Sequence, residues 1–341
     1  MKSPFDESDC QIAQLTSPDG TVEILNLPDG RRKLTLKPRD TSVSIARPTC
    51  ETSLPIPVIQ SFLDLSFGWL CEALARHDDP EYVRRMLGTQ LFAYFDPEAF
   101  RGKRLLDFGC GSGASTLAMA RMLPETEIVG VELNAHSIEL ARKVQAARPL
   151  PNVTFIVSEN PSTLPAGIGT FDFAMLSAVY EHLLPDERRN VMPLIWSGLD
   201  FGGVLFVNQT PYRYFPYEHH STGLWLINYL PDGISHYMAR KFSRINPEIN
   251  RSPDWNVHLR GGIRGGTEGE ILRNIRATAV GRSTVLQPKN QDRAAYWLAC
   301  TNQDRHRVLK KLTSSVFRLT DKLWGTVPGI NVDVVIRKDR G

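Results

Sequence analysis

A strand that runs into a glycine-rich turn and then into a helix most constrains how this chain can fold. An apolar run at 104–108 is followed by Gly109, Gly111 and Gly113, and a helix is expected over 114–123. Glycine tolerates positive φ and, having no Cβ, lets a ligand lie against the backbone. The G-x-G-x-G spacing differs from the G-x-G-x-x-G of dinucleotide folds, where a helix N-terminus meets a pyrophosphate. The turn therefore predicts a ligand site on an α/β fold and disfavours a nicotinamide oxidoreductase.

Two carboxylates frame this turn. Asp107 lies in the end of the first predicted strand, and Glu132 ends the next one, at 127–132. An anion at Asp107 suits a ligand with an ammonium group and suits a diphosphate poorly. A carboxylate at the end of the second strand can accept both hydroxyls of a ribose. The expected ligand is a nucleoside that carries a positive charge.

Apolar strands alternate with helical patterns from 103 to about 210, which is typical of a parallel sheet. The expected strands are 104–108, 127–132, 153–157, 171–176, 203–207, 283–286 and 332–336. We therefore predict an α/β fold, a Rossmann-like seven-stranded and mostly parallel sheet with helices on both faces.

On the D-x-G-C-G-x-G run and the acid that ends the next strand, the chain resembles a class I S-adenosylmethionine-dependent methyltransferase. The resemblance covers about residues 100–210 and is to the ubiquinone-biosynthesis and general small-molecule types. It implies S-adenosylmethionine as the cofactor. It further implies that Asp107 holds the amino group of the donor, that Glu132 holds the ribose hydroxyls, and that three glycines face the methionine and ribose moieties. These glycines are Gly109, Gly111 and Gly113.

Five more residues are expected at the donor site from the same resemblance. Glu159 with Asn160 stands where the family often has an acid that contacts the adenine amine, with Glu in place of the commoner Asp. Cys110, Leu133 and Ser177 are expected to line the site, and Cys110 has no nucleophilic role.

The acceptor is expected at the carboxyl ends of the fourth and fifth strands, because these ends form the binding crevice of an α/β sheet. His182 lies in a segment similar to the E-H-L segment of ubiquinone-biosynthesis-type methyltransferases, and His219 and His220 follow the fifth strand. Each is a candidate base, since the unperturbed pKa of histidine, about 6.5, suits proton transfer near neutrality. Aromatic residues at 212–217 would wall an aromatic or lipid-like acceptor. Alternatively, His182 only holds its loop and the aromatic residues only pack together.

The same segment bears on metal binding. Small-RNA 2′-O-methyltransferases and certain quinone O-methyltransferases use E-x-x-E-H together with another ligand. Here Ala178 replaces the first acid, which leaves Glu181 and His182 with a third ligand at His219 or His220. Because that acid is missing, we predict no metal, with a divalent ion on these side chains as the alternative.

The regions that flank the central sheet suggest further units. Two alternating runs around Pro28-Asp29-Gly30 predict a hairpin, and leucines and a valine spaced by three and four along a late helix predict a core or homodimer contact. The late residues are Leu309, Leu312, Val316, Leu319 and Leu323. The expected units are a β-rich N-terminal extension (1–55), a helical cap (56–100) and a methyltransferase domain (101–341) with a lid or acceptor insertion at about 211–265.

Composition limits the partners. Residues 1–230 hold 20 Lys and Arg against 27 Asp and Glu, whereas residues 231–341 hold 20 against 10. The basic portion is compatible with an anionic acceptor, but no dense basic block or RNA-binding signature favours nucleic acid. Five scattered cysteines without a C-x-x-C pair, no signal-like start and no apolar stretch of membrane-spanning length predict a cytoplasmic protein.

The function predicted from the sequence is O-methylation of a small or medium-sized metabolite. Methylation at nitrogen or carbon, or of a glycan or lipid-linked intermediate, is the alternative within enzymes. From a different class, the chain could be a non-catalytic S-adenosylmethionine-binding subunit of a partner.

Overall fold

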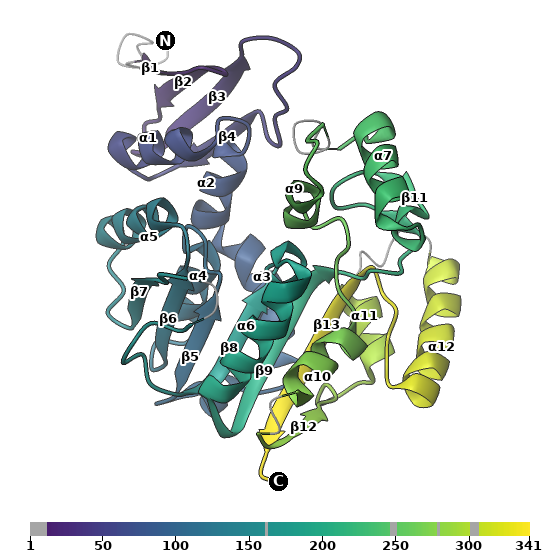
Figure 1. Cartoon of the computed structure of the whole chain (residues 1–341). Helices are drawn as coiled ribbons and strands as arrows, with labels where there is room; N and C mark the ends of the chain where they lie inside the picture. Colours follow the sequence, from purple (N-terminus) through teal and green to yellow (C-terminus); the bar gives the residue numbers. More distant parts are fainter. Residues whose placement is uncertain (1–11, 161–162, 246–250, 278–279, 301–306) are drawn as a thin grey trace.

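The computed structural model describes residues 12–160, 163–245, 251–277, 280–300 and 307–341 (Figure 1). Its centre is a seven-stranded sheet in the order β12-β13-β9-β8-β5-β6-β7. The strands are β5 (Arg104–Phe108), β6 (Glu127–Glu132), β7 (Val153–Val157), β8 (Phe171–Ser177), β9 (Leu199–Pro211), β12 (Arg282–Val285) and β13 (Asn331–Asp339). Strands β5 to β9 run parallel, and β13 pairs antiparallel with both β9 and β12. The predicted Rossmann-like sheet is confirmed.

Helices cover both faces of this sheet, because successive strand residues point to opposite sides. Leu105 packs with α4 (Ala114–Met122) and α5 (Ala135–Ala147), whereas its neighbour Leu106 packs with α6 (Pro185–Gly198) and α10 (Glu268–Arg276). The first face also carries α1 (Ile56–Leu65), α2 (Leu70–Asp78), α3 (Pro80–Phe92) and the 3-10 helix η2 (Pro97–Phe100). The helical segment expected at 56–100 thus joins the core that supports β5 and α4.

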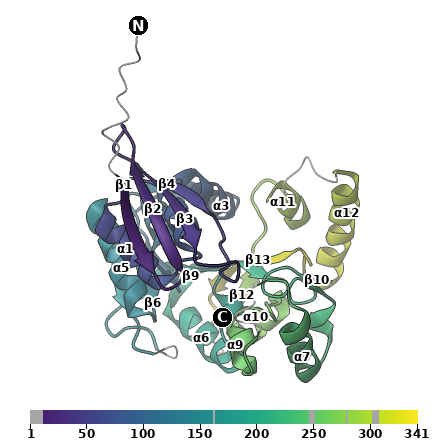
Figure 2. The same cartoon turned by 90° about the horizontal axis from the view of Figure 1, so that it is seen from above.

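Before α1 the chain forms a second, four-stranded antiparallel sheet (Figure 2). It consists of β1 (Ile12–Ser17), β2 (Gly20–Asn26), β3 (Arg32–Pro38) and β4 (Thr49–Thr52). The predicted hairpin is β2–β3, and Gly30 in its turn has φ 81°. Arg148, which follows α5, donates to Asp78 at the end of α2, and Asp78 in turn accepts from Thr52 of β4. This chain of contacts ties the small sheet to the large one.

The insertion expected at about 211–265 lies beyond the carboxyl ends of β8 and β9 (Figure 1). Its elements are β10 (Tyr217–Glu218), β11 (Leu224–Trp225), η4 (Ile227–Tyr229), α7 (Asp232–Phe242) and α9 (Trp255–Arg260). Ile227, Ala239 and Ile263 form a small core of its own. The insertion is therefore a packed unit, and its role as a lid stays a prediction, as does the division of the chain into three domains.

Two late helices, α11 (Arg293–Cys300) and α12 (Arg307–Trp324), pack together before β13. The predicted apolar stripe lies on α12, but Leu312, Val316, Leu319 and Leu323 are each more than half exposed. These four side chains are not core, and a contact between two copies of the chain stays a prediction. The side chain of Leu309 lies outside the described residues. Across the described residues, no helix is both long enough and apolar enough to span a bilayer.

Candidate functional site

The three glycines of the turn have different surroundings. Each has positive φ, at 74°, 52° and 82° for Gly109, Gly111 and Gly113. A Cβ on Gly109 would lie 2.7 Å from Cγ2 of Val179, and one on Gly113 would lie 2.7 Å from Cζ of Phe155. A Cβ on Gly111 would meet nothing within 4 Å. Gly111 therefore presents bare backbone to open space, whereas Gly109 and Gly113 allow close packing.

Backbone amides fix the carboxylate of Glu132. Its Oε2 accepts from the Gly111 N–H at 3.1 Å, and its Oε1 accepts from the N–H groups of Leu133 and Asn134 at 2.7 and 3.0 Å. The acid at the end of β6 is thereby held against the glycine turn, at the position from which the sequence predicted ribose binding.

Asp107 lies under the turn and is 2 % exposed. Its Oδ2 accepts from the Thr116 hydroxyl at 2.6 Å. Burial, opposed by the Thr116 bond and aided by the nearby Glu132, raises the pKa of this carboxyl to about 6. No described cation forms an ion pair with Asp107, so an ammonium group of a ligand would complete its surroundings.

Two cavities open at the carboxyl ends of the parallel strands and share Gly109 and Ala178. One, of about 330 Å³, is lined by Glu132, Leu133 and Ser158 together with Val179 and His182. The other, of about 510 Å³, is lined by the glycine turn, by the ends of β8 and β9, and by helices α2 and α3. Its residues include Cys110, Gly111, Ser177, His219 and His220. The two cavities adjoin at these shared residues and together form one groove.

Of the remaining donor-site candidates, some line the two cavities and others do not. Ser177 accepts from Gln209 Nε2 at 2.9 Å, and Cys110 is buried, with its thiol pKa raised by that burial. Glu159 and Asn160 are exposed in the turn after β7, and neither lines the two described cavities. Ser158, just before them, lines the smaller cavity instead.

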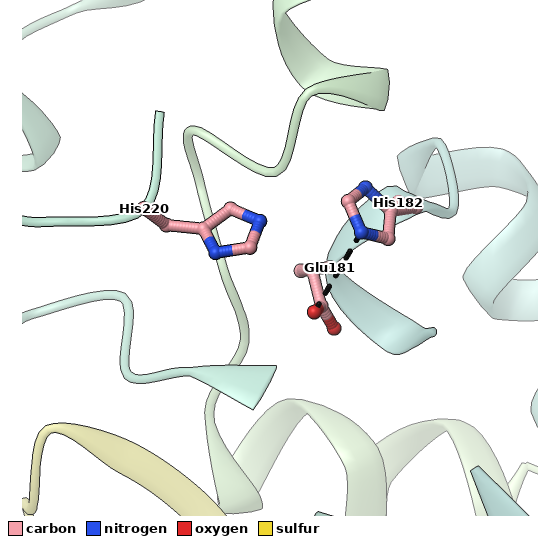
Figure 3. Close-up of side chains that lie close together, drawn as sticks. All are labelled: Glu181, His182 and His220. Atoms are coloured by element: carbon pink, nitrogen blue, oxygen red, sulfur yellow. Dashed lines mark ion pairs between the residues drawn. The ribbon is translucent and has the colours of Figure 1, made fainter. Parts of the chain in front are cut away.

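A buried carboxylate and two imidazoles meet beside these cavities (Figure 3). Glu181 and His182 lie in η3 (Tyr180–His182) after β8, and His220 comes from the loop after β10. One ligand-capable atom of each lies within 4.8 Å of the others. Glu181 is fully buried; its Oε2 accepts from the Thr210 hydroxyl at 3.0 Å, and its Oε1 lies 3.8 Å from His182 Nε2.

The surrounding loops orient both imidazoles. The Nδ1 of His182 lies 2.6 Å from the carbonyl oxygen of Arg260, so that carbonyl accepts its proton and Nε2 faces Glu181. The backbone N–H of His220 donates to Glu218. The His220 ring packs over Gly262, and a Cβ added to Gly262 would lie 2.7 Å from Cδ2 of this ring. Burial lowers the pKa of His220 to about 4, so its ring is neutral near pH 7.

His219 behaves differently from its neighbour. Its ring contacts Phe215 at 6.4 Å between centroids and lies outside the cluster of three, although it lines the larger cavity. The sequence left the third position open between His219 and His220, and the structure brings His220 to Glu181 and His182.

Several lining residues were not predicted individually. Trp69, Ala73, Arg76 and Leu87 from the helical segment line the larger cavity, as does Gln209 at the end of β9. The sequence pointed to the helices as a cover for the cofactor but not to these side chains, because their approach to the turn depends on tertiary packing. The φ of 58° at Gln209 is likewise invisible in the sequence pattern.

The central region of the chain is similar to known methyltransferase domains. The sequence model of a methyltransferase domain family matches residues 105–203, from β5 into β9. The chain is 31 % identical over 115 residues to malonyl-[acyl-carrier protein] O-methyltransferase of Legionella pneumophila, covering 32 % of this chain and 39 % of that protein. It is 29 % identical over 110 residues to carboxy-S-adenosyl-L-methionine synthase of Sodalis glossinidius, covering 32 % and 44 %.

The chain spans about half the length or less of the first curated relatives it matches. Among solved structures, an O-methyltransferase family protein from Burkholderia thailandensis aligns with 79 % of this chain and 61 % of its own, at 14 % identity and a TM-score of 0.44. The family assignment rests on the matched domain model and on the relatives.

Proposed function

This chain carries a class I S-adenosylmethionine-dependent methyltransferase domain, and on that premise we propose that it transfers the donor's methyl group to an oxygen atom of a small or medium-sized metabolite. One observation carries the proposal. His182 lines the smaller cavity, His220 lines the larger one, and both imidazoles lie close to the buried carboxylate of Glu181, so they could take up a hydroxyl proton.

We infer the orientation of the donor from the residues that line the two cavities. The adenosine would occupy the smaller cavity, where Glu132 accepts from the ribose hydroxyls and Leu133 and Ser158 lie near the base. The methionine part would lie over Gly111 toward Ser177 in the larger cavity. Its ammonium group would approach Asp107, which lies buried under the turn and lines neither cavity, directly or through water. The sulfonium would then lie near Gly109 and Ala178, which both cavities share.

Transfer from this position is an in-line displacement. The acceptor oxygen attacks the methyl carbon, the carbon–sulfur bond breaks, and the electron pair stays on sulfur as the uncharged thioether. Because the sulfonium is already activated, the protein mainly supplies alignment and exclusion of water. The hydroxyl proton leaves to a base, for which His182, His219 and His220 are the candidates. Their place in the lining of the two cavities supports this role.

The curated relative that acts on an oxygen of malonyl-[acyl-carrier protein] supports an oxygen acceptor, within the limits of its coverage. The relative named carboxy-S-adenosyl-L-methionine synthase points to a second candidate, in which the donor itself is modified. The partnership of Glu181 with two histidines favours transfer to an acceptor, since these groups could take up an acceptor's proton.

Two measurements test the proposal. Calorimetric titration with S-adenosylmethionine and with S-adenosylhomocysteine should show binding of both. Incubation with methyl-labelled donor and a cell extract should then label a small molecule through an ether or ester oxygen. Donor binding without any labelled product would favour a non-catalytic subunit, and a product labelled at nitrogen or carbon would overturn the oxygen acceptor.

A further inference from the structure

We propose that Glu181, His182 and His220 bind a divalent transition-metal ion at the acceptor side of the groove. Two imidazole nitrogens and one carboxylate oxygen form a ligand set that suits Zn²⁺, Mn²⁺, Fe²⁺ or Co²⁺ better than the all-oxygen sites of Mg²⁺ and Ca²⁺. The inference rests on the proposed function, because it assigns to this ion the task of activating the acceptor oxygen.

The distances allow coordination with small side-chain movements. Ligand atoms bound at about 2.0–2.2 Å to a tetrahedral ion lie roughly 3.3–3.6 Å apart. The Glu181 Oε1 and His182 Nε2 atoms are 3.8 Å apart, and all three ligand atoms lie within 4.8 Å of one another. Figure 3 shows the two imidazoles on either side of the carboxylate, with His220 reaching it from a separate loop.

The carboxylate itself points to a missing partner. The side chain of Glu181 has no solvent exposure. Within the described residues, no hydrogen-bond donor reaches its Oε1 atom. Arg188 is near, but it donates to the backbone oxygen of Glu181 and forms its ion pair with Glu270. A buried polar atom without a partner is costly, and a bound cation would remove that cost.

The contacts around the ligands are of the kind that orient metal sites. Metal-binding histidines commonly donate their second ring N–H to a carbonyl or carboxylate, which fixes the tautomer. His182 places Nδ1 at 2.6 Å from the Arg260 carbonyl and so presents Nε2 to the site. The second oxygen of Glu181 is held by Thr210, so the unpaired oxygen has a fixed direction.

An ion held by three protein ligands keeps positions open for other groups. An acceptor hydroxyl bound there would have its pKa lowered by the metal charge and would attack as the alkoxide. Of the three candidate bases, His219 would be the one left with both ring nitrogens uncoordinated, in the same larger cavity. The ion would thus take over part of the role first assigned to His182 and His220.

The test uses the full chain, stripped with a chelator and dialysed. Titration with Co²⁺, followed by its visible absorption and by calorimetry, should show one tightly bound ion, with Zn²⁺ competing and Mg²⁺ competing poorly. Glu181→Gln and His220→Asn should each weaken Co²⁺ binding by at least about tenfold. His219→Asn and His236→Asn are the matched controls and should leave the affinity for Co²⁺ unchanged.

The outcomes separate this inference from the proposed function. Wild-type protein that binds the donor but no Co²⁺ or Zn²⁺ overturns the metal site alone, whereas absence of donor binding overturns the methyltransferase proposal. Equal Co²⁺ affinity in wild type and His220→Asn would also exclude the site. Because Glu181 is buried and its variant could misfold, the half-buried His220 provides the decisive comparison, with thermal unfolding of each chelated variant as the check.

Discussion

The two halves of the groove are built in different ways. The donor half comes from one strand–turn–helix–strand unit, in which Gly111 and Glu132 are 21 positions apart and backbone amides hold the carboxylate. The acceptor half joins η3 to the insertion, so that His182 meets the Arg260 carbonyl 78 positions later in the chain. Local backbone geometry defines the first half, and tertiary packing of distant loops defines the second. Changes in one half should therefore have little effect on binding by the other.

The largest expected effect is on the acceptor half. The triple variant His182→Asn, His219→Asn and His220→Asn should lower labelled methyl transfer by about 10²-fold or more, because the hydroxyl proton loses its acceptor. Donor affinity, measured by calorimetry, should change by less than about twofold, since the glycine turn and Glu132 are untouched. Unchanged turnover would remove the base role, and a large loss of donor affinity would break the comparison between the halves.

A pair of glycine substitutions sharpens the comparison within the donor half. Gly113→Ala should destabilise the fold by about 2–5 kcal/mol, because left-handed strain adds to a clash with Phe155. Gly111→Ala incurs only the strain, about 1–2 kcal/mol, but its methyl group enters the cavity and should weaken donor binding more than it weakens the fold. Urea unfolding and donor titration measure the two effects. Equal loss of stability in both variants would contradict these separate roles.

Asp107 gives the donor half a pH dependence. The buried carboxyl has a pKa of about 6 against 3.8 for the free side chain, so between these values the folded state holds a proton that the unfolded state has lost. The free energy of unfolding should consequently fall as pH rises from about 4 to 6, by up to about 3 kcal/mol, and level off above. Asp107→Asn should remove this fall.

The quantity to measure is the difference between wild type and Asp107→Asn, since the buried Glu181 and Glu268 and the half-buried Asp333 also have raised pKa values. Saturating donor should flatten the wild-type curve, because its ammonium group would stabilise the ionised carboxylate. A difference curve that stays flat between pH 4 and 6 would show that Asp107 does not titrate as the buried geometry requires.

The smallest effect is expected at the surface of the acceptor half. Glu187 pairs with Arg260, and their side chains are 17 % and 47 % exposed. Glu187→Gln should change stability by about 1 kcal/mol or less, since an ion pair with one exposed partner contributes little. It should still lower methyl transfer measurably at unchanged donor affinity, because Arg260 supplies the carbonyl that orients His182. Identical turnover in both proteins would show that the loop keeps its position without the pair.

The sequence predicted the donor half of the groove better than the acceptor half. The order of strands and helices and the hairpin at Gly30 were predictable because they depend on local patterning and on turn residues. Strands β1 and β4 were not predicted, since short strands gain their definition from pairing with neighbours. At the site, the sequence identified the carboxylates around the glycine turn but left His219 and His220 undistinguished. Tertiary packing separates them, since the ring of His220 lies over Gly262 and the ring of His219 contacts Phe215.

Ala178 connects these halves in another respect. Ala178 lines both cavities, and its φ is 54°. Gln209, at the end of the adjacent strand, also has a positive φ. A left-handed alanine stores conformational energy that glycine would release. Ala178→Gly should therefore raise the melting temperature, and bulkier residues there would narrow the connection between the two cavities. Under the proposed function, such a change would alter which acceptors can be methylated.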